Sequence, residues 1–148
     1  MRVRALIAAI AAAVLTLVLT CAEADAASPL RFSGAQYNSP GSDTGSNASL
    51  NAEWIRVTNH GKRARNMTGW TIRDAAGHVY HFPTFRLGPG HSVRLHTGKG
   101  RNTRRNLYWR QGWYVWNNTG DRATLKTRAR VRIDVCHWGD GSGYTSCR

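Results

Sequence analysis

The amino-acid sequence predicts an all-β protein, folded as an antiparallel β-sandwich. Outside an apolar N-terminal run, no segment repeats apolar residues at helical spacing. Apolar and β-branched residues instead come in about seven short stretches, separated by turn residues every ~8 to 12 positions, a pattern typical of two packed antiparallel sheets. No internal repeat and no long linker divides the chain. We therefore expect a single domain.

The first 26 residues are set apart from this fold. A basic start precedes an apolar run, Ala5 to Leu19, that is short for a membrane span, and Ala24-Asp25-Ala26 then offers small residues at the cleavage positions. This pattern predicts a signal peptide over residues 1–26 and a secreted mature domain over residues 28–148, with no stable membrane span after cleavage. The alternatives are an uncleaved anchor and a lipid attached at Cys21.

The mature chain begins with two strand-like stretches separated by a polar one. Leu30 to Tyr37 alternates apolar and polar residues around Gly34, and Ala52 to Asn59 is rich in aromatic and β-branched residues. Each predicts a strand. Asn38 to Asn51, rich in Ser, Gly and Asn, predicts a loop held by local side-chain hydrogen bonds. It lacks the regular spacing of oxygen ligands that a calcium loop needs.

The middle of the chain contains the clearest turn signals. Trp70 to Arg73 and His78 to Phe82 predict two strands, joined by a turn that opens with Asp and ends with Gly. Pro83 ends the second strand because it has no amide hydrogen to donate. Gly88-Pro89-Gly90 then reverses the chain before a third strand, His91 to Thr97. Three such strands in sequence predict a β-meander.

A basic loop and two further strands complete the pattern. Gly98 to Asn106 has no apolar residue and predicts a solvated loop, whereas Ala123 and Leu125 mark a short strand. The residues that follow alternate strictly, which predicts a half-buried strand. The predicted core face is Ala129, Val131, Ile133 and Val135, and the predicted solvent face is Arg128, Arg130, Arg132 and Asp134.

Two cysteines, Cys136 and Cys147, remain after signal cleavage. In an exported protein an even pair predicts a disulfide, and closing so short a loop contributes about 3 kcal/mol in the chain-entropy model. The alternative is a metal site shared with His137, but further ligands at suitable spacing are missing. We expect neither a metal site nor a cofactor.

The mature domain is strongly basic. The formal net charge is +13, and cleavage leaves it unchanged because two basic and two acidic residues are removed together. Such a charge attracts polyanions, so nucleic acid and an anionic cell-wall polymer are candidate partners. Arginine outnumbers lysine, as a GC-rich genome would also produce, so the basic surface is either functional or compositional.

Aromatic residues among the arginines suggest where a polyanion would bind. Trp109 and Trp113 flank Arg110 and follow the basic loop; aromatic rings can stack on bases or sugars while cations hold phosphates. The alternative is that both rings pack beneath the loop. The candidate polyanion-binding residues are Arg101, Arg104, Arg105, Trp109, Arg110, Trp113, Arg128, Arg130 and Arg132.

The histidines offer no catalytic site. His78 and His81 lie three positions apart in a predicted strand and so point to opposite faces. A general acid–base pair needs a partner carboxylate, and the mature chain has few acidic residues, several of them in turns. The same scarcity argues against a metal-dependent nuclease. We therefore expect a protein that is not an enzyme, with no catalytic residues.

A series of short motifs runs in order through most of the mature chain. They are Glu53–Asn59, Met67–Ile72, Asp74 with Gly77, Tyr80 with Phe82-Pro83, Leu87–Gly90, Thr97–Gly100, and Trp116–Asn118 with Gly120-Asp121. Together they resemble the lamin tail domain family in its bacterial, exported form. The resemblance implies an immunoglobulin-like sandwich, a binding or scaffolding role and no catalytic residues. The tryptophans in its strand motifs, expected in the core, are Trp54, Trp70 and Trp116.

The chain departs from the family pattern at Thr127 to Arg130, where a hairpin turn containing glycine is usual. The expected function is a secreted, non-enzymatic binding module whose basic surface attaches to extracellular DNA or anionic cell-wall polymer. The alternative is a structural or protein-interaction module whose partner is another exported protein. Salt dependence separates the two, because affinity for a polyanion falls steeply as salt rises.

Overall fold

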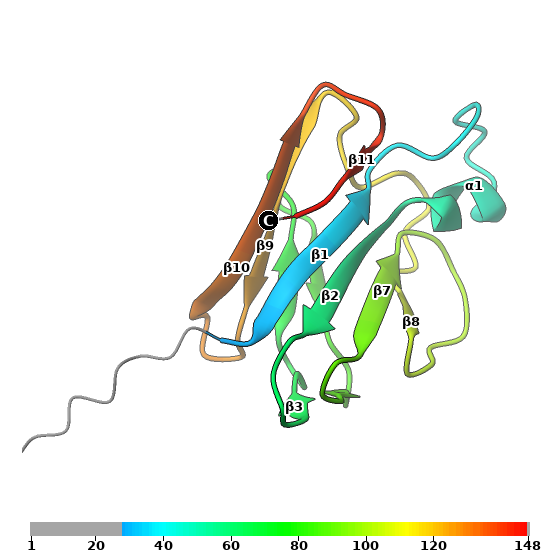
Figure 1. The fold of residues 1–148 in the computed structure, drawn as a ribbon. Helices are drawn as coiled ribbons and strands as arrows, with labels where there is room; N and C mark the ends of the chain where they lie inside the picture. Colours follow the sequence, from blue (N-terminus) through cyan, green and yellow to red (C-terminus); the bar gives the residue numbers. More distant parts are fainter. Residues whose placement is uncertain (1–27, 148) are drawn as a thin grey trace, which may run out of the picture.

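The computed structural model describes residues 28–147, which form a two-layer β-sandwich (Figure 1). The predicted signal peptide lies outside the described residues. The five-stranded sheet has the order β11 (Tyr144–Thr145), β1 (Leu30–Gln36), β2 (Trp54–Asn59), β7 (Ser92–His96) and β8 (Asn106–Tyr108). The four-stranded sheet has the order β10 (Arg132–Gly139), β9 (Gly120–Lys126), β4 (Thr71–Arg73) and β5 (Val79–His81). Two short strands, β3 (Arg65–Asn66) and β6 (Arg86–Leu87), pair with each other in a separate two-stranded sheet.

The all-β sandwich predicted from the sequence is confirmed. All strand pairs are antiparallel except β7 with β8, which run parallel. β1 pairs with β2 through a register shift between Phe32 and Gly34, at the glycine expected to interrupt this strand. A Cβ at Gly34 would approach the Tyr144 hydroxyl to 2.8 Å, so glycine at this position leaves room for the Tyr144 side chain. Within residues 28–147, no helix is long and apolar enough to cross a membrane.

The predicted β-meander is wrong. β4 and β5 form the expected hairpin, with Ile72 opposite Tyr80. β7, however, belongs to the other sheet, where Leu95 lies opposite Ile55 of β2. The chain leaves the hairpin at Pro83, which cannot extend the hydrogen-bond ladder, and crosses to the five-stranded sheet through β6. This crossing places the following basic loop beside β2 and β7.

The predicted loop between β1 and β2 contains a short helix, α1 (Asn47–Ala52). Ser46 caps it by accepting a hydrogen bond from the Ser49 amide at 3.3 Å, and Leu50 is its one buried residue. Six residues with one apolar side chain are too few to show helical periodicity. The expectation of an irregular loop was therefore wrong at this segment.

The predicted faces of β10 are correct only in part: Ile133 packs against the core and Arg132 is exposed, as expected, but Val131 and the residues from Asp134 onward differ. Val131 is 59% exposed, whereas Cys136 and Trp138 are buried. The register of β10 against β9 shifts between Arg132 and Asp134, and the Asp134 carboxylate points inward to accept a hydrogen bond from the Phe32 amide at 2.7 Å. The prediction assumed that polar residues of the strand face solvent, and the inward-facing Asp134 does not follow that rule.

Arg128 and Arg130 precede β10 in a tight turn and do not form a row with Arg132 on a strand. The amide of Thr127 donates to the carbonyl of Val131, and the amide of Arg130 donates to that of Thr127, both at 2.9 Å. Arg130 has a φ of 64°, the left-handed conformation that glycine adopts most readily. Arginine thus occupies the position of this turn whose conformation glycine adopts most readily.

A chain of aromatic rings in contact runs through the core. Tyr80 meets Trp109 at 5.9 Å between ring centroids, Trp109 meets Trp116 at 5.7 Å, Trp116 meets Trp138 at 5.5 Å, and Trp138 meets Tyr37 at 5.1 Å. The burial of Trp116 was predicted and is confirmed, and Trp70 packs against the edge of the same core. Three of these contacts are edge-to-face and the fourth, between Trp138 and Tyr37, is stacked. Such aromatic contacts each add about 1 kcal/mol to ordinary apolar burial.

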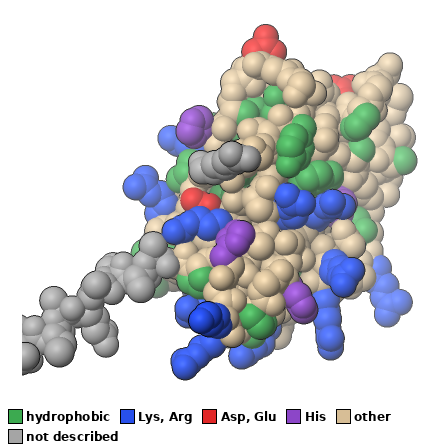
Figure 2. All heavy atoms as spheres, in the orientation of Figure 1, with side chains coloured by type: hydrophobic (Ala, Val, Ile, Leu, Met, Phe, Trp, Pro, Cys, Tyr) green, Lys and Arg blue, Asp and Glu red, His purple; other side chains and the backbone are tan. Residues whose placement is uncertain are grey.

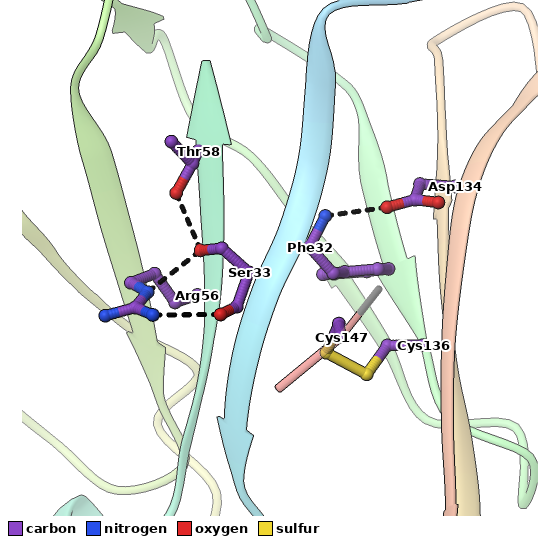
Figure 3. Close-up of a disulfide and its surroundings, with 7 residues drawn as sticks. All are labelled: Phe32, Ser33, Arg56, Thr58, Asp134, Cys136 and Cys147. Atoms are coloured by element: carbon purple, nitrogen blue, oxygen red, sulfur yellow. Dashed lines mark hydrogen bonds between the residues drawn. A yellow bond between two sulfur atoms is a disulfide. The ribbon is translucent and has the colours of Figure 1, made fainter. Parts of the chain in front are cut away.

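The predicted disulfide between Cys136 and Cys147 is confirmed. It lies between β1 and β10, on the same side of β1 as the Asp134–Phe32 hydrogen bond (Figure 3). Because both thiols are used in the disulfide, the alternative metal site with His137 is wrong. The bond fastens the segment that carries β11 to β10, and so joins the two sheets at one edge.

Candidate polyanion-binding surface

Two arginines face each other across neighbouring strands on the outer side of the five-stranded sheet. Arg56 of β2 lies directly opposite Arg94 of β7 in the register. The strand period places them there, because Ile55, Val57 and Leu95 point into the core and their neighbours must point out. Like charges directly opposite each other destabilise a pair of strands. The arrangement is therefore one that a bound anion would relieve.

Both guanidinium groups are held in place by neutral partners. Arg56 donates from Nε to the Ser33 hydroxyl and from Nη2 to the Ser33 carbonyl, each at 2.8 Å (Figure 3). The Arg94 guanidinium lies over the ring of Trp54, 4.6 Å from its centroid, and that of Arg56 lies 5.9 Å away. Cation–π contact and these hydrogen bonds fix both groups without neutralising them.

Trp54 was predicted in the core, and this prediction is wrong. Position 54 has the same strand parity as Arg56, so its ring lies on the outer face, half-buried beneath the two guanidinium groups. The ring of Tyr144 covers it from β11, at 6.1 Å between centroids. Trp54 thus serves as the platform of the arginine pair.

The basic loop brings two further arginines to the same place. Because β8 runs parallel to β7, Asn106 lies opposite Arg94, and the Arg94 amide donates to the Arg105 carbonyl at 2.9 Å. Thr103 holds the end of the loop by accepting hydrogen bonds from the amides of Arg105 and Asn106. The result is a hollow of about 590 Å³, here called the arginine hollow. Four arginines, Arg56, Arg94, Arg104 and Arg105, line it together with His91.

The arginine hollow has no internal counter-charge. Among residues 28–147 the one ion pair is between His78 and Asp74, so no lysine or arginine in that range is paired with a carboxylate. Lys and Arg side chains are spread over the middle and lower parts of the face in Figure 2, from its left side to its right side. Because none of these cations is in an ion pair within residues 28–147, the positive field of this face is available to a polyanion and is weakened by added salt.

The predicted site residues are divided among several places. Arg104 and Arg105 line the arginine hollow, and Arg101 is exposed on the same loop. Arg110 lies at the base of that loop, where its Nη2 donates to the Gly100 carbonyl at 3.1 Å. The other three candidates are exposed at the turn between β9 and β10, on the four-stranded sheet. They are Arg128, Arg130 and Arg132.

The two candidate aromatic residues lie in different environments. Trp109 is buried in the core stack, so its predicted contact with a ligand is wrong. Trp113 is 63% exposed, but the charged residues beside it are Asp43 and Asp121, not arginines. Neither ring can therefore stack on a base held by the basic loop.

Sequence reasoning missed Arg56 and Arg94 as binding residues. The available signal was that each is the outward-facing residue of an alternating strand, in Ile-Arg-Val and Val-Arg-Leu. What could not be read from these triplets is that the two strands are neighbours and that their arginines are in register. The pairing appears only once the fold is known.

Catalytic chemistry has little support in the described part of the chain. Residues 28–147 contain no group of three His, Cys, Asp or Glu side chains that could hold a metal ion. His96 is occupied structurally, bonded to the Asn51 carbonyl at 2.7 Å and to the Asn106 side chain at 2.8 Å. The Glu53 carboxyl, with its pKa raised to about 7 by burial, is enclosed in the core.

The fold and this surface define a class of protein: an immunoglobulin-like β-sandwich domain of the binding or interaction type. The model of one family, Lamin Tail Domain, matches residues 23–140. The chain therefore belongs to the lamin tail domain family, a family of non-enzymatic domains. A comparison with curated proteins found no significant match.

Proposed function

We propose that this lamin tail domain is a secreted, non-enzymatic module that binds extracellular polyanions through the arginine hollow. The observation that carries the proposal is the cross-strand pair of Arg56 and Arg94, which faces solvent with no carboxylate beside it. The polyanion is DNA or an anionic cell-wall polymer, because both present repeated phosphate groups to arginine. A disulfide supports the extracellular assignment.

The donors of the arginine hollow suit phosphate. A guanidinium group offers five N–H donors in a fixed plane and binds two oxygens of one phosphate at once. Arg56 uses Nε and Nη2 on Ser33, which leaves Nη1 without a partner in the described chain. Arg94 is oriented by the Trp54 ring, and its guanidinium donates no hydrogen bond within residues 28–147. Two anchored groups with free donors are prepared to receive an anion without much loss of side-chain entropy.

The test compares two triple variants that each remove three positive charges. R94S/R104S/R105S removes three of the four arginines of the arginine hollow, whereas R128S/R130S/R132S alters the exposed turn of the other sheet. We would measure binding of the purified protein to labelled DNA and to teichoic acid from about 25 to 300 mM NaCl. For DNA, the slope of log affinity against log salt concentration should become shallower by about 2 to 3 in the first variant. In the second variant the slope should stay nearly unchanged.

Equal losses in the two variants would overturn the assignment to the arginine hollow and indicate attraction by overall charge. Absence of binding to both polymers at low salt would overturn polyanion binding itself. The structural or protein-interaction alternative would then be tested with exported proteins as partners. Binding to one polymer alone identifies which of the two is the ligand.

A further inference from the structure

A second hollow lies at the end of the sandwich where β9 begins, away from the arginine hollow. It has a volume of about 650 Å³ and is formed by the β8–β9 connection, the β4–β5 turn and the segment before α1. We call it the tryptophan hollow. The residues used below are Asp43, Trp113, Tyr114, Asn117, Asn118 and Asp121.

The exposed ring of Trp113 is held firmly despite its 63% exposure. One edge packs on Gly45, where an added Cβ would come within 2.6 Å of the ring. Tyr114 contacts it edge-on, at 5.3 Å between centroids, and is itself fixed by a hydrogen bond between its hydroxyl and that of Ser49 at 2.5 Å. The indole is therefore a rigid, solvent-facing platform and does not move freely.

The charge of the tryptophan hollow is opposite to that of most of the surface. Its lining includes two carboxylates, Asp43 and Asp121, and no lysine or arginine. A polyanion would be repelled from it. The ligand for Trp113 must therefore be uncharged or cationic, and it differs from the ligand of the arginine hollow.

Polar groups around the ring are free to bind hydroxyls. In the described chain, the side chains of Asp43 and Asn118 make no hydrogen bond, and Asn117 uses only its carbonyl oxygen, on Thr119. Asp121 is fully engaged by backbone amides, including those of Ala75 and Asn117 at 3.0 Å, and so shapes the wall. Free amide donors and a free carboxylate lie beside a flat apolar surface.

We propose that the tryptophan hollow is a binding site for neutral polysaccharide. A pyranose ring has an apolar C–H face and a rim of hydroxyl groups. Its face stacks on Trp113, while Asp43 accepts hydrogen bonds from its hydroxyls and the amides of Asn117 and Asn118 donate to them. This site is independent of the polyanion proposal, because its ligand is uncharged and because none of the arginines takes part in binding it.

The test is an isothermal calorimetric titration of the purified full chain with cellohexaose and, separately, with chitohexaose. We expect binding to at least one of them, unchanged when NaCl rises from about 25 to 300 mM. Trp113→Ala should weaken it at least about tenfold, as expected for loss of one stacking platform, while Trp113→Phe keeps a flat ring and loses less. Asn118→Ala should weaken it by a few-fold.

Two controls distinguish binding at the tryptophan hollow from nonspecific binding of sugars elsewhere on the protein. Tyr144→Ala removes another exposed aromatic ring, 42% exposed and on the outer sheet face, and should leave sugar affinity unchanged. R94S/R104S/R105S should also leave it unchanged, even if polyanion binding is lost. Failure of both sugars to bind would overturn the proposal. Wild-type affinity in the Trp113→Ala protein, with its fold confirmed by circular dichroism, would overturn it equally.

Discussion

Glu53 is the one carboxyl group buried in the core of the described chain whose pKa is clearly displaced. Its Oε1 accepts hydrogen bonds from the Thr97 hydroxyl at 2.5 Å and from the amides of Val115 and Trp116 at 2.9 and 3.3 Å, while Oε2 is buried without a partner. Burial penalises the charged form more than these donors favour it, which raises the pKa from 4.5 to about 7. The residue joins β2, β7 and the β8–β9 connection.

The free energy of unfolding should therefore fall as pH rises through neutrality. Because the folded pKa lies above the unfolded value, the stabilising contribution of protonated Glu53 is complete below about pH 4.5 and is lost as pH rises past 7. The pKa difference corresponds to at most about 3 kcal/mol. Urea unfolding between about pH 4 and pH 8 measures it, as the difference between wild type and Glu53→Gln.

Glu53→Gln keeps the carbonyl oxygen that receives the three hydrogen bonds but cannot ionise. Its stability should lack this component of the pH dependence, and relative to wild type it should gain stability steadily from pH 5 to pH 8. Parallel pH profiles for the two proteins would contradict the assignment of a pKa of about 7 to Glu53.

Individual strands differ in how far their sequence determines their place. The ends of β4, β5 and β7 are marked by Asp, Gly and Pro, whose backbone preferences act locally, and these strands were predicted to within about a residue at most ends. β10 shows the limit of such reasoning. Its inward positions are decided by Asp134 reaching β1 and by Cys136 reaching Cys147, both long-range contacts. The strand period is visible in sequence, but its phase was set by distant partners.

The disulfide should matter most for β11 and the segment around it. Replacing both Cys136 and Cys147 by alanine frees this segment from β10 and should lower the free energy of unfolding by about 3 kcal/mol. Hydrogen exchange should rise first at the amides of Tyr37 and Asn38, which donate to the Gly143 carbonyl. Urea unfolding and exchange of the variant measure the two effects.

A control is the same measurement on wild type with and without a thiol reductant. Reduction should reproduce the effect of the double variant and should add nothing to it. If the variant unfolds at the wild-type urea concentration, the chain-entropy argument fails for this loop. If exchange rises uniformly over the sandwich, the segment unfolds only with the rest of the domain.

The candidate site was predictable only in part because it is assembled across the chain. Arg104 and Arg105 belong to a segment without apolar residues, and such a segment must be solvated wherever the fold places it. Arg56 and Arg94 become a pair through sheet order and register, which no local pattern contains. Trp109 and Trp113 have similar sequence surroundings, yet one is in the core and the other is exposed.

Unpaired positive charge should make the stability of the protein depend on salt. Because no lysine or arginine within residues 28–147 has a carboxylate partner, added salt screens repulsion and should raise the thermal midpoint. Polyphosphate should raise it further at far lower ionic strength, because it binds the folded state. Differential scanning calorimetry in NaCl and in polyphosphate measures both effects.

R94S/R104S/R105S should show a weaker response to polyphosphate than R128S/R130S/R132S, although both lose the same charge. A thermal midpoint that falls with added salt would contradict the view that repulsion among these cations opposes folding. Equal responses of the two variants would locate the repulsion in the overall charge and not in the arginine hollow.

The pairing of β1 with the C-terminal β11 affects the risk of aggregation while the chain is being synthesised. One edge of β1 is covered at once by β2, but among residues 28–147 the other edge is paired by β11 and by the Asp134 side chain. Gln36 bonds to a carbonyl 107 residues further on. Until those residues exist, β1 presents an open edge, and open edges recruit strands from other chains. The two residues of β11, which are synthesised last, therefore cover this edge and oppose aggregation through it.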